Sequence, residues 1–197
     1  PLWYPIVKHL KDEYGAKVIF DCLDDFIGFN NVSTEVGQME SMLSNTSDYC
    51  ITTSTVLYER LSRQVDNVIL VRNATEFEHF HNLPVNNKLR HINKPIIGYY
   101  GAIAEWFDTP MIEHIASQRP DWSIVLIGNT FGSDIRRLKK CKNVHLLGEK
   151  SYSELPEFLY WFDVCIIPFK ANELTRSTDP VKFYEYISSG KPVVSSQ

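Results

Sequence analysis

A lysine and a glutamate lie three positions apart near the end of the chain, in the stretch DPVKFYEYISSGKPVVSS. An Asp-Pro pair ahead of Lys182 and Glu185 is typical of a helix start, and Gly190 is typical of a helix end. The two charges could form an exposed ion pair worth only about 0.3 kcal/mol. Alternatively, the carboxylate could accept hydrogen bonds from a vicinal diol while the ammonium attracts a phosphate. The cap, the glycine stop and the long loop ahead of the helix favour the ligand site.

Two aspartates end the motif DCLDD, which directly follows a short apolar run. Paired carboxylates suit hard divalent cations, so a metal site is one interpretation of Asp24 and Asp25. The favoured interpretation is structural, with strand-end aspartates that cap the chain or face a cleft between domains. A contact with an acceptor substrate, or a catalytic role for Asp24 or Asp25, is the remaining alternative. No metal site is predicted.

Short apolar runs rich in Val, Ile and Tyr alternate with segments of helical pattern and would position these residues. Such runs, bounded by polar turns, are typical of buried parallel strands. The expected strands are 17–21, 49–53, 67–71, 95–101, 122–128, 143–148, 163–169 and 192–196. Strand–helix alternation with short connections predicts an α/β fold with a doubly wound parallel sheet of the Rossmann type, preceded by part of a second Rossmann-like domain.

The polar stretch 72–94 interrupts this alternation and lacks clear periodicity. It divides the chain into an expected first domain (1–80), a linker (81–94) and a second domain (95–197). The chain starts with Pro1 rather than Met and stops just after a strand-like run, so we expect it to be part of a longer protein.

The composition is that of an ordinary globular protein, with 44% hydrophobic and 22% charged residues. The net charge of −4 and the absence of a basic stripe give no reason to expect a nucleic-acid partner. Four cysteines lie far apart, and three are in apolar runs, which indicates free thiols in a reducing, cytoplasmic compartment. No apolar run is long enough to span a bilayer.

In a doubly wound sheet, ligands bind beyond the carboxyl ends of the strands. The residues expected there are 101–103, 128–130, 148–151 and the loop 168–178. Three of these four segments begin with glycine, which lets the backbone approach a phosphate closely. The dinucleotide fingerprint G-x-G-x-x-G and the P-loop are both absent, which argues against nicotinamide binding and ATP hydrolysis.

Four stretches of the second half carry a family resemblance: IIGYYGAIAEWFD, PDWSIVLIG, NVHLLGEKSYSELPEFLYWFDVCIIPF and LTRSTDPVKFYEYISSGKPVV. They resemble the donor-binding half of bacterial GT-B-fold glycosyltransferases, most of all the family 4 type that builds cell-surface polysaccharides. Upstream, VIFDCLDDF, DYCITTSTVLYERL and NVILVRNATEFEHF resemble the last strands of the acceptor half. The resemblance therefore covers nearly the whole chain.

The resemblance implies what the two parts do. Residues 1–80 would be the end of the acceptor-side domain, and residues 95–197 a truncated nucleotide-sugar domain. A UDP- or GDP-sugar would bind in the cleft between the halves, without metal or cofactor. Its sugar would pass to a saccharide or lipid-linked acceptor at the inner face of the membrane, with peripheral membrane contact through parts outside this chain.

Individual residues acquire roles from the same resemblance. Glu185 matches the glutamate that accepts hydrogen bonds from the ribose hydroxyls. Pro180, Val181 and Lys182 would lie at a helix N-terminus that favours a diphosphate. The remaining matches are the glycine turn beneath the phosphates, Gly101 and Ala102, and the base-holding Lys150 and Ser151.

Other positions depart from the family pattern. Retaining members usually carry a second glutamate eight positions before the ribose-binding one, where this chain has Ser177. They also carry an arginine and a lysine after the first glycine turn, where this chain has Ala102 and Phe107. A departing diphosphate still needs stabilising charge. Our hypothesis is that Arg176 or Lys182 supplies it, which makes both candidate catalytic residues.

Two further functions remain open alongside glycosyl transfer. A sugar-nucleotide epimerase of similar fold would need acid and base groups around the sugar, and few such groups are near the expected loops. A non-catalytic module could retain only a nucleotide pocket. For residues 1–197 alone we expect weak nucleotide binding and no turnover.

Overall fold

The computed structural model describes residues 1–28 and 33–196 and divides the chain into two compact units. The first unit comprises Pro1–Asn73 and Asn172–Asp179, and the second comprises Ala74–Ala171 and Pro180–Gln197. Both are α/β units with parallel sheets, as predicted. The units divide at residue 73 rather than 80, and a short later segment, Asn172–Asp179, belongs to the first unit.

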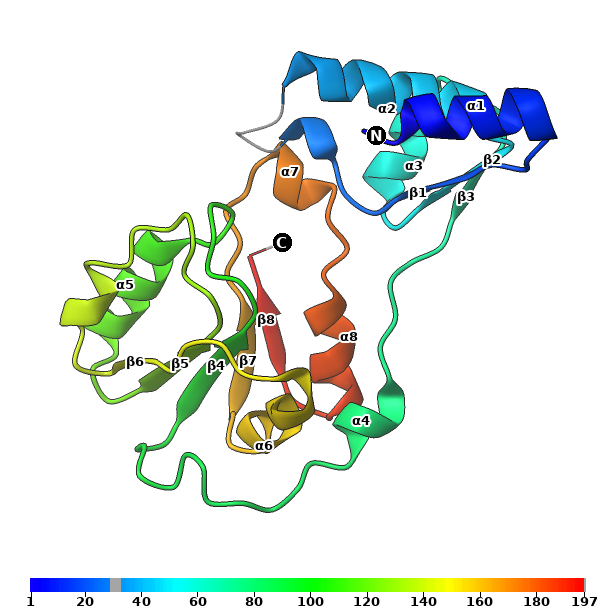
Figure 1. Cartoon of the computed structure of the whole chain (residues 1–197). Coiled ribbons are helices and arrows are strands. Elements are labelled where there is room, and N and C mark those ends of the chain that lie inside the picture. Colours follow the sequence, from blue (N-terminus) through cyan, green and yellow to red (C-terminus); the bar gives the residue numbers. More distant parts are fainter. Residues whose placement is uncertain (29–32, 197) are drawn as a thin grey trace. The chain divides into compact units, whose positions relative to one another are not determined.

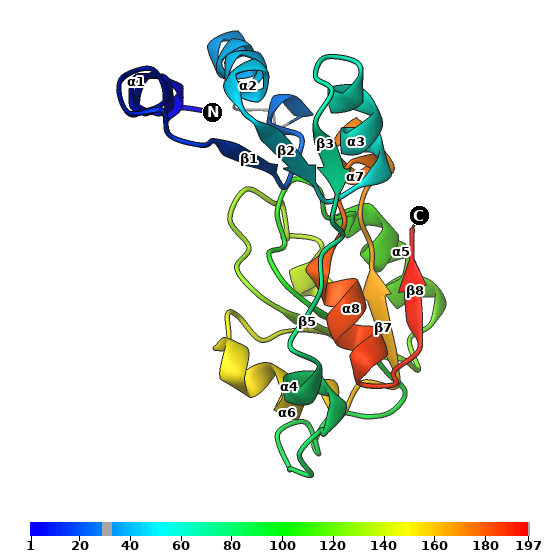
Figure 2. The same ribbon diagram turned by 90° about the vertical axis from the view of Figure 1, so that its right-hand side faces the viewer.

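The first unit contains a three-stranded parallel sheet (Figure 1), and Figure 2 shows its strands in the order β1-β2-β3. Its strands are β1 (Ile19–Cys22), β2 (Tyr49–Thr52) and β3 (Val68–Leu70). Its helices are α1 (Tyr4–Tyr14), the 3₁₀ turn η1 (Phe26–Gly28), α2 (Thr34–Thr46), α3 (Thr55–Ser62) and α7 (Glu173–Arg176). A small apolar core lies between the sheet and helices α2 and α3, built from Phe20, Cys22, Leu43, Cys50, Leu57 and Leu61.

The second unit contains a five-stranded parallel sheet in the order β6-β5-β4-β7-β8 (Figure 1). Its strands are β4 (Ile96–Tyr100), β5 (Ser123–Ile127), β6 (Val144–Leu146), β7 (Val164–Ile167) and β8 (Val193–Ser195). Every residue of β4 and β5 is buried, which explains why these two strands are almost wholly apolar in sequence. The first strand of the unit, β4, lies in the middle, so the strand order reverses between β4 and β7. That reversal is where doubly wound sheets bind ligands.

Local sequence signals mark several of the helix ends in the second unit. They are α4 (Phe77–His81), α5 (Thr109–Gln118), η2 (Leu138–Lys140), η3 (Tyr152–Glu154), α6 (Leu155–Leu159) and α8 (Val181–Ser188). The Asp108 carboxylate caps α5 by accepting a hydrogen bond from the Met111 N–H at 2.9 Å. Ser151 and Glu154 form a capping box at the start of η3. Gly190, at φ 72°, follows the end of α8.

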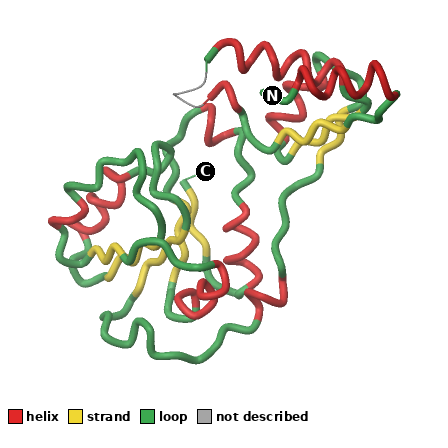
Figure 3. The backbone as a smooth tube through the Cα atoms, in the orientation of Figure 1, coloured by secondary structure: helices red, strands yellow, loops and turns green. Residues whose placement is uncertain are grey.

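The segment predicted as a linker, 81–94, is instead part of the second unit. It is drawn as loop after α4 in Figure 3, yet Leu89 and Ile92 are buried in the core of that unit together with Phe80. Isolated apolar residues among polar ones show no periodicity, so their burial did not appear in the sequence pattern. The segment of helical pattern at 133–140 likewise contains only the single turn η2.

Three of the four cysteines are buried and all four are free thiols, as predicted. Within residues 1–28 and 33–196, the helices are too short or too polar to cross a bilayer.

Candidate functional site

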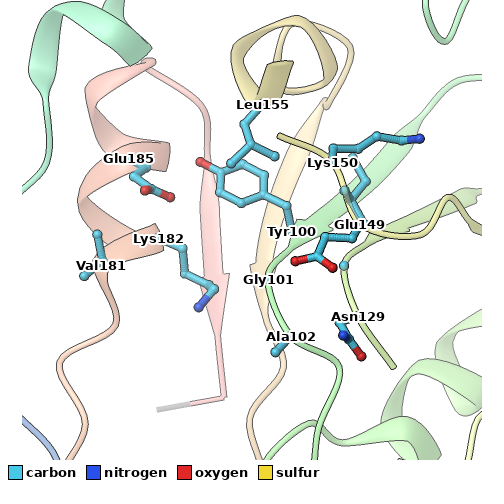
Figure 4. A pocket seen from close by; sticks show the side chains of 12 residues that line it. Tyr100, Gly101, Ala102, Asn129, Glu149, Lys150, Leu155, Val181, Lys182 and Glu185 are labelled. Atoms are coloured by element: carbon cyan, nitrogen blue, oxygen red, sulfur yellow. The ribbon is translucent and has the colours of Figure 1, made fainter. Parts of the chain in front are cut away.

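A cavity of about 300 Å³ opens at the carboxyl ends of three neighbouring strands of the second unit (Figure 4). Its walls come from the ends of β4 and β5, the loop after β6, and the first turns of α6 and α8. The lining residues are Tyr100, Gly101, Ala102, Ile127, Gly128, Asn129, Glu149, Lys150, Leu155, Val181, Lys182 and Glu185. The site thus lies at the edge of the sheet that the sequence predicted.

Two glycines bring the loops of this pocket together. Gly101 and Gly128 have φ values of +131° and +144°, which side chains rarely adopt. A Cβ on Gly128 would lie 2.0 Å from the Gly101 carbonyl oxygen, and one on Gly101 would lie 2.8 Å from Cε of Lys182. Close approach of the two turns therefore requires glycine at position 128, and the positive φ favours glycine at position 101. The result is a pocket wall made of backbone.

Helix α8 is attached to β4 by Tyr186, which is fully buried. Its hydroxyl oxygen accepts a hydrogen bond from the Tyr100 N–H at 3.0 Å. Because residues three positions apart share a helix face, anchoring at Tyr186 leaves Lys182 and Glu185 together on the face that lines the pocket. The sequence spacing predicted this shared face.

The Glu185 side chain is buried, with only 7% of the residue exposed. Burial raises the pKa of its carboxyl group, and the Tyr100 hydroxyl and the Lys182 ammonium oppose that rise. Of the ion pairs among the described residues, none joins Glu185 to Lys182. The interpretation of these two residues as an exposed surface pair is therefore wrong.

Lys182 extends over aromatic rings rather than onto a carboxylate. Its Nζ lies 5.7 Å from the centre of the Tyr99 ring and 5.3 Å from that of Phe169, which are cation–π distances. Burial lowers the pKa of the ammonium group, and Glu185 opposes that change. A partly buried cation without a salt bridge is well suited to attract a ligand anion.

Tyr100 is the residue of the pocket that sequence reasoning missed. It is 3% exposed, and its hydroxyl oxygen lacks a hydrogen-bond partner among the described residues. In Figure 4 this hydroxyl points toward the Glu185 carboxylate. Its position, last in a strand and directly before a glycine turn, was the available signal. In the sequence it is one more apolar residue of the run PIIGYYG.

Most of the predicted donor-site residues line this pocket, and Ser151 is an exception. Gly101, Ala102, Lys150 and Val181 line it together with Lys182 and Glu185. The Ser151 hydroxyl instead donates a hydrogen bond to Glu154 at 2.8 Å, within the capping box. Asn129, Glu149 and Leu155 also line the pocket, and the first two belong to strand-end loops that the sequence singled out.

The residues that line this pocket do not include Ser177, Arg176, Lys170 or Phe107. Ser177 and Arg176 belong to the first unit, where the buried Ser177 hydroxyl donates to the Leu174 carbonyl at 2.7 Å. Lys170 belongs to the second unit and donates to the Glu105 carbonyl at 2.6 Å. Phe107, at the position of a family lysine, is a core residue whose ring packs against Tyr99. Of the two cations in our hypothesis, Lys182 is the one that lines the pocket.

The two aspartates of the DCLDD motif differ in their surroundings. The Asp25 carboxylate forms an ion pair with Arg60 at 3.2 Å. Asp24 is half-buried, and burial raises the pKa of its carboxyl group. A group of three or more potential metal ligands does not occur within residues 1–28 and 33–196. A catalytic or acceptor-binding role for Asp24 or Asp25 stays a prediction.

Comparisons with a family profile and with a curated protein sequence both indicate a glycosyltransferase. The profile of the family described as "Glycosyl transferases group 1" matches residues 94–197, just over half of the chain. A Bacillus subtilis protein that is named as a teichuronic acid biosynthesis glycosyltransferase, TuaH, is 26% identical over 217 aligned residues. The match covers 99% of this chain but only 55% of that protein, so the chain spans about half the length of this relative.

Comparison with solved structures agrees on the fold. The structure of HepE from Anabaena in complex with UDP-glucose is similar over 98% of this chain and 56% of that one, with a TM-score of 0.79 and 15% identity. Sucrose-phosphate synthase from Thermosynechococcus elongatus is similar over 98% of this chain and 53% of that one, with a TM-score of 0.75 and 17% identity. The chain therefore shares the paired Rossmann-like architecture of GT-B enzymes.

Proposed function

Since the chain belongs to the group 1 glycosyl transferases, we propose that its second unit binds a nucleotide-diphosphate sugar whose sugar is transferred to a saccharide or lipid-linked acceptor. The observation that supports this most is the pair on α8: a buried carboxylate without a salt bridge, Glu185, next to a partly buried ammonium, Lys182. A fold does not leave two such charges in one pocket to stabilise itself, because each costs desolvation free energy. Both are suited to a ligand that offers hydroxyls and phosphates.

The geometry supports a particular placement of that ligand. The ribose hydroxyls donate to the Glu185 carboxylate, which offers acceptors for both. The diphosphate lies between the Gly101–Ala102 turn and the N-terminus of α8, where Lys182 and the first free N–H groups of the helix favour negative charge. The base lies toward the loop that contains Lys150. Whether the donor sits between the two halves of the enzyme stays a prediction.

In this proposal, the Lys182 ammonium stabilises the negative charge of the departing diphosphate. The two positions that hold cations in related enzymes are Ala102 and the core residue Phe107, and neither can supply charge. Lys182 is next to the Gly101 turn, as shown by the 2.8 Å between its Cε and a Cβ built on that glycine. An ammonium held there would stabilise the developing negative charge without a metal ion.

The chemical class of the acceptor is proposed from the name of a relative. The relative TuaH is named for teichuronic acid biosynthesis. We propose a saccharide or lipid-linked acceptor of that kind, met at the inner face of the membrane.

Incubating the intact protein with labelled UDP- and GDP-sugars and a lipid-linked saccharide tests the function. Transfer of label to the acceptor is the expected result, with addition of a chelator leaving the rate unchanged. A donor converted to its epimer would replace the proposal by isomerase activity. Nucleotide binding with neither transfer nor epimerisation would indicate a non-catalytic module. A Lys182→Met protein serves as the low-activity control.

A further inference from the structure

The Tyr100 hydroxyl is a buried polar group without a partner. Its oxygen is shielded from solvent and has no partner at hydrogen-bonding geometry among the described residues, although the Glu185 carboxylate influences its pKa. Leaving a buried hydroxyl unpaired costs about 1–3 kcal/mol. Such groups are uncommon in folded proteins and call for a reason, such as a ligand that supplies the missing bond.

The position of this hydroxyl is set by packing on two sides of the ring. The Tyr100 ring packs edge-on against Tyr186 of α8, with centroids 4.8 Å apart, and lies parallel to Phe80 of α4 at 6.4 Å. The Tyr100 N–H also donates to the Tyr186 hydroxyl oxygen. The ring therefore cannot easily turn to another partner. Tyr100 lines the same pocket as Glu185, and its hydroxyl points toward that carboxylate (Figure 4).

A carboxylate and a phenol offer complementary chemistry. The ionised Glu185 can only accept hydrogen bonds, whereas a neutral phenol can also donate one. Burial keeps Tyr100 neutral by raising the pKa of its hydroxyl far above the usual range, and Glu185 adds to that rise. Each hydroxyl of a vicinal diol is both a donor and an acceptor. A carboxylate can only accept hydrogen bonds from the two O–H groups of a diol. A neighbouring phenol can donate a hydrogen bond to one of the diol oxygens.

We propose that Tyr100 is a second ribose-binding residue, which donates a hydrogen bond to one of the two diol oxygens whose protons are held by Glu185. The inference rests on the proposed function, since it takes the pocket to be a nucleotide site. It assigns Tyr100 a share in selecting ribose over deoxyribose. The free protein then holds the hydroxyl unpaired, and the bound nucleotide pairs it.

The Tyr100→Phe variant tests this, because it removes one oxygen and keeps the ring. Affinities of the intact protein for UDP, 2′-deoxy-UDP and 3′-deoxy-UDP are measured by calorimetry, with the GDP series used if guanosine diphosphate is the nucleotide bound. UDP should bind about five- to tenfold more weakly to the variant, as expected for one lost hydrogen bond. With one of the two deoxy nucleotides, wild-type and variant affinities should converge, which identifies the hydroxyl read by Tyr100.

Two controls separate binding from folding. The melting temperature of the free Tyr100→Phe protein should be unchanged or higher, since the lost hydroxyl had no partner in the free state. The Tyr160→Phe variant removes a hydroxyl outside the pocket and should bind every nucleotide as the wild type does.

Specific results would overturn the inference. An equal loss of affinity for all three nucleotides, or none, excludes a bond from Tyr100 to the diol. A lower melting temperature with unchanged affinity assigns the hydroxyl to the fold. If UDP binding is weakened by Glu185→Gln but not by Tyr100→Phe, this inference fails while the proposed function stands. If the wild-type protein binds neither UDP nor GDP, both fail.

Discussion

Each of the two units contains a buried glutamate, and the two glutamates differ in which groups balance their negative charge. Glu40 of α2 is 3% exposed, and Glu185 of α8 is 7% exposed. The Arg60 guanidinium bridges Glu40 to Asp25 at the end of β1, and its Nη2 also lies 3.7 Å from the Cys22 sulfur. Glu185 forms no ion pair with any described residue, and instead faces a cavity and the unpaired hydroxyl of Tyr100.

This difference separates a charge used by the fold from a charge available to a ligand. Burial raises the pKa of both carboxyl groups. For Glu40 the largest opposing influence is the guanidinium of Arg60, which comes from the protein itself. For Glu185 the opposing groups are the Tyr100 phenol, the Lys182 ammonium and His79. Buried carboxylates of similar exposure can thus have different roles, and the partner rather than the burial distinguishes them.

The largest effect should come from removing Arg60, the cation that contacts both Glu40 and Asp25. Arg60→Met leaves Glu40 buried without its counter-charge and should lower the free energy of unfolding by about 3 kcal/mol, measured by urea denaturation. The double variant Arg60→Met with Glu40→Met should regain most of that loss. The exposed Arg63, at the end of the same helix, provides the matched control as Arg63→Met. A single-variant loss no larger than that of the control would mean that the cluster does not neutralise Glu40.

Glu185→Gln should instead affect binding and spare the fold. The lost carboxylate removes charge-assisted hydrogen bonds to the ribose, so affinity for UDP should fall roughly 10- to 100-fold by calorimetry. Because burial raises the pKa of Glu185, the ionised group destabilises the free protein at neutral pH, and the melting temperature should be unchanged or higher.

The exposed Glu78→Gln, on α4, is the control for Glu185→Gln and should change neither quantity. A marked drop in melting temperature with normal UDP affinity would place Glu185 in the same class as Glu40.

Lys182→Met should weaken diphosphate binding about tenfold, since it removes one charge-assisted contact of about 1.4 kcal/mol. Uridine, which lacks phosphates, should bind wild type and variant alike. Lys142→Met removes an exposed lysine and should have no effect. Equal weakening of uridine and UDP would show that Lys182 shapes the pocket rather than binding phosphate.

The smallest effect should be a dependence of donor affinity on pH. The ribose binds ionised Glu185, whose pKa is raised above the ordinary 4.5, so affinity should rise with pH through that raised pKa and then level off. The pKa of Lys182 is lowered from the ordinary 10.5, so affinity should fall again as pH rises through that lowered value. UDP-glucose is the suitable probe because its diphosphate diester does not titrate in this window.

One variant tests each limb of this pH profile, and donor affinity should change a few-fold across each limb. Glu185→Gln should flatten the acidic limb and Lys182→Met the alkaline limb. A profile that keeps both limbs in both variants would show that other groups control the pH dependence.

Several features of the site could be predicted because they depend on local sequence. The runs IIGYY and SIVLI indicate central parallel strands, since both of their faces are buried. The Asp108 cap and the Gly190 stop define helix ends through hydrogen bonds and φ values within a few residues. The i, i+3 spacing of Lys182 and Glu185 places them on one helix face.

Other features depend on which elements meet and were not predictable. Arg176 and Ser177 adjoin α8 in sequence, which suggested the donor site, yet they belong to the first unit with Leu174. Leu89 and Ile92 are buried although they lie in a polar, aperiodic stretch. Tyr100 was counted as a strand residue, because an aromatic run does not indicate which hydroxyl will be left unpaired.

The sequence by itself determined the alternation of strands and helices, the glycine turns at strand ends and the pairing of Lys182 with Glu185 on one face. These three features follow from local hydrogen bonds and from the regular side-chain periodicity of helices and strands. Only the tertiary structure decided that Glu40 has a guanidinium beside it while Glu185 has a cavity and a tyrosine. The environment of a buried charge is set by residues distant in sequence, and local sequence does not encode it.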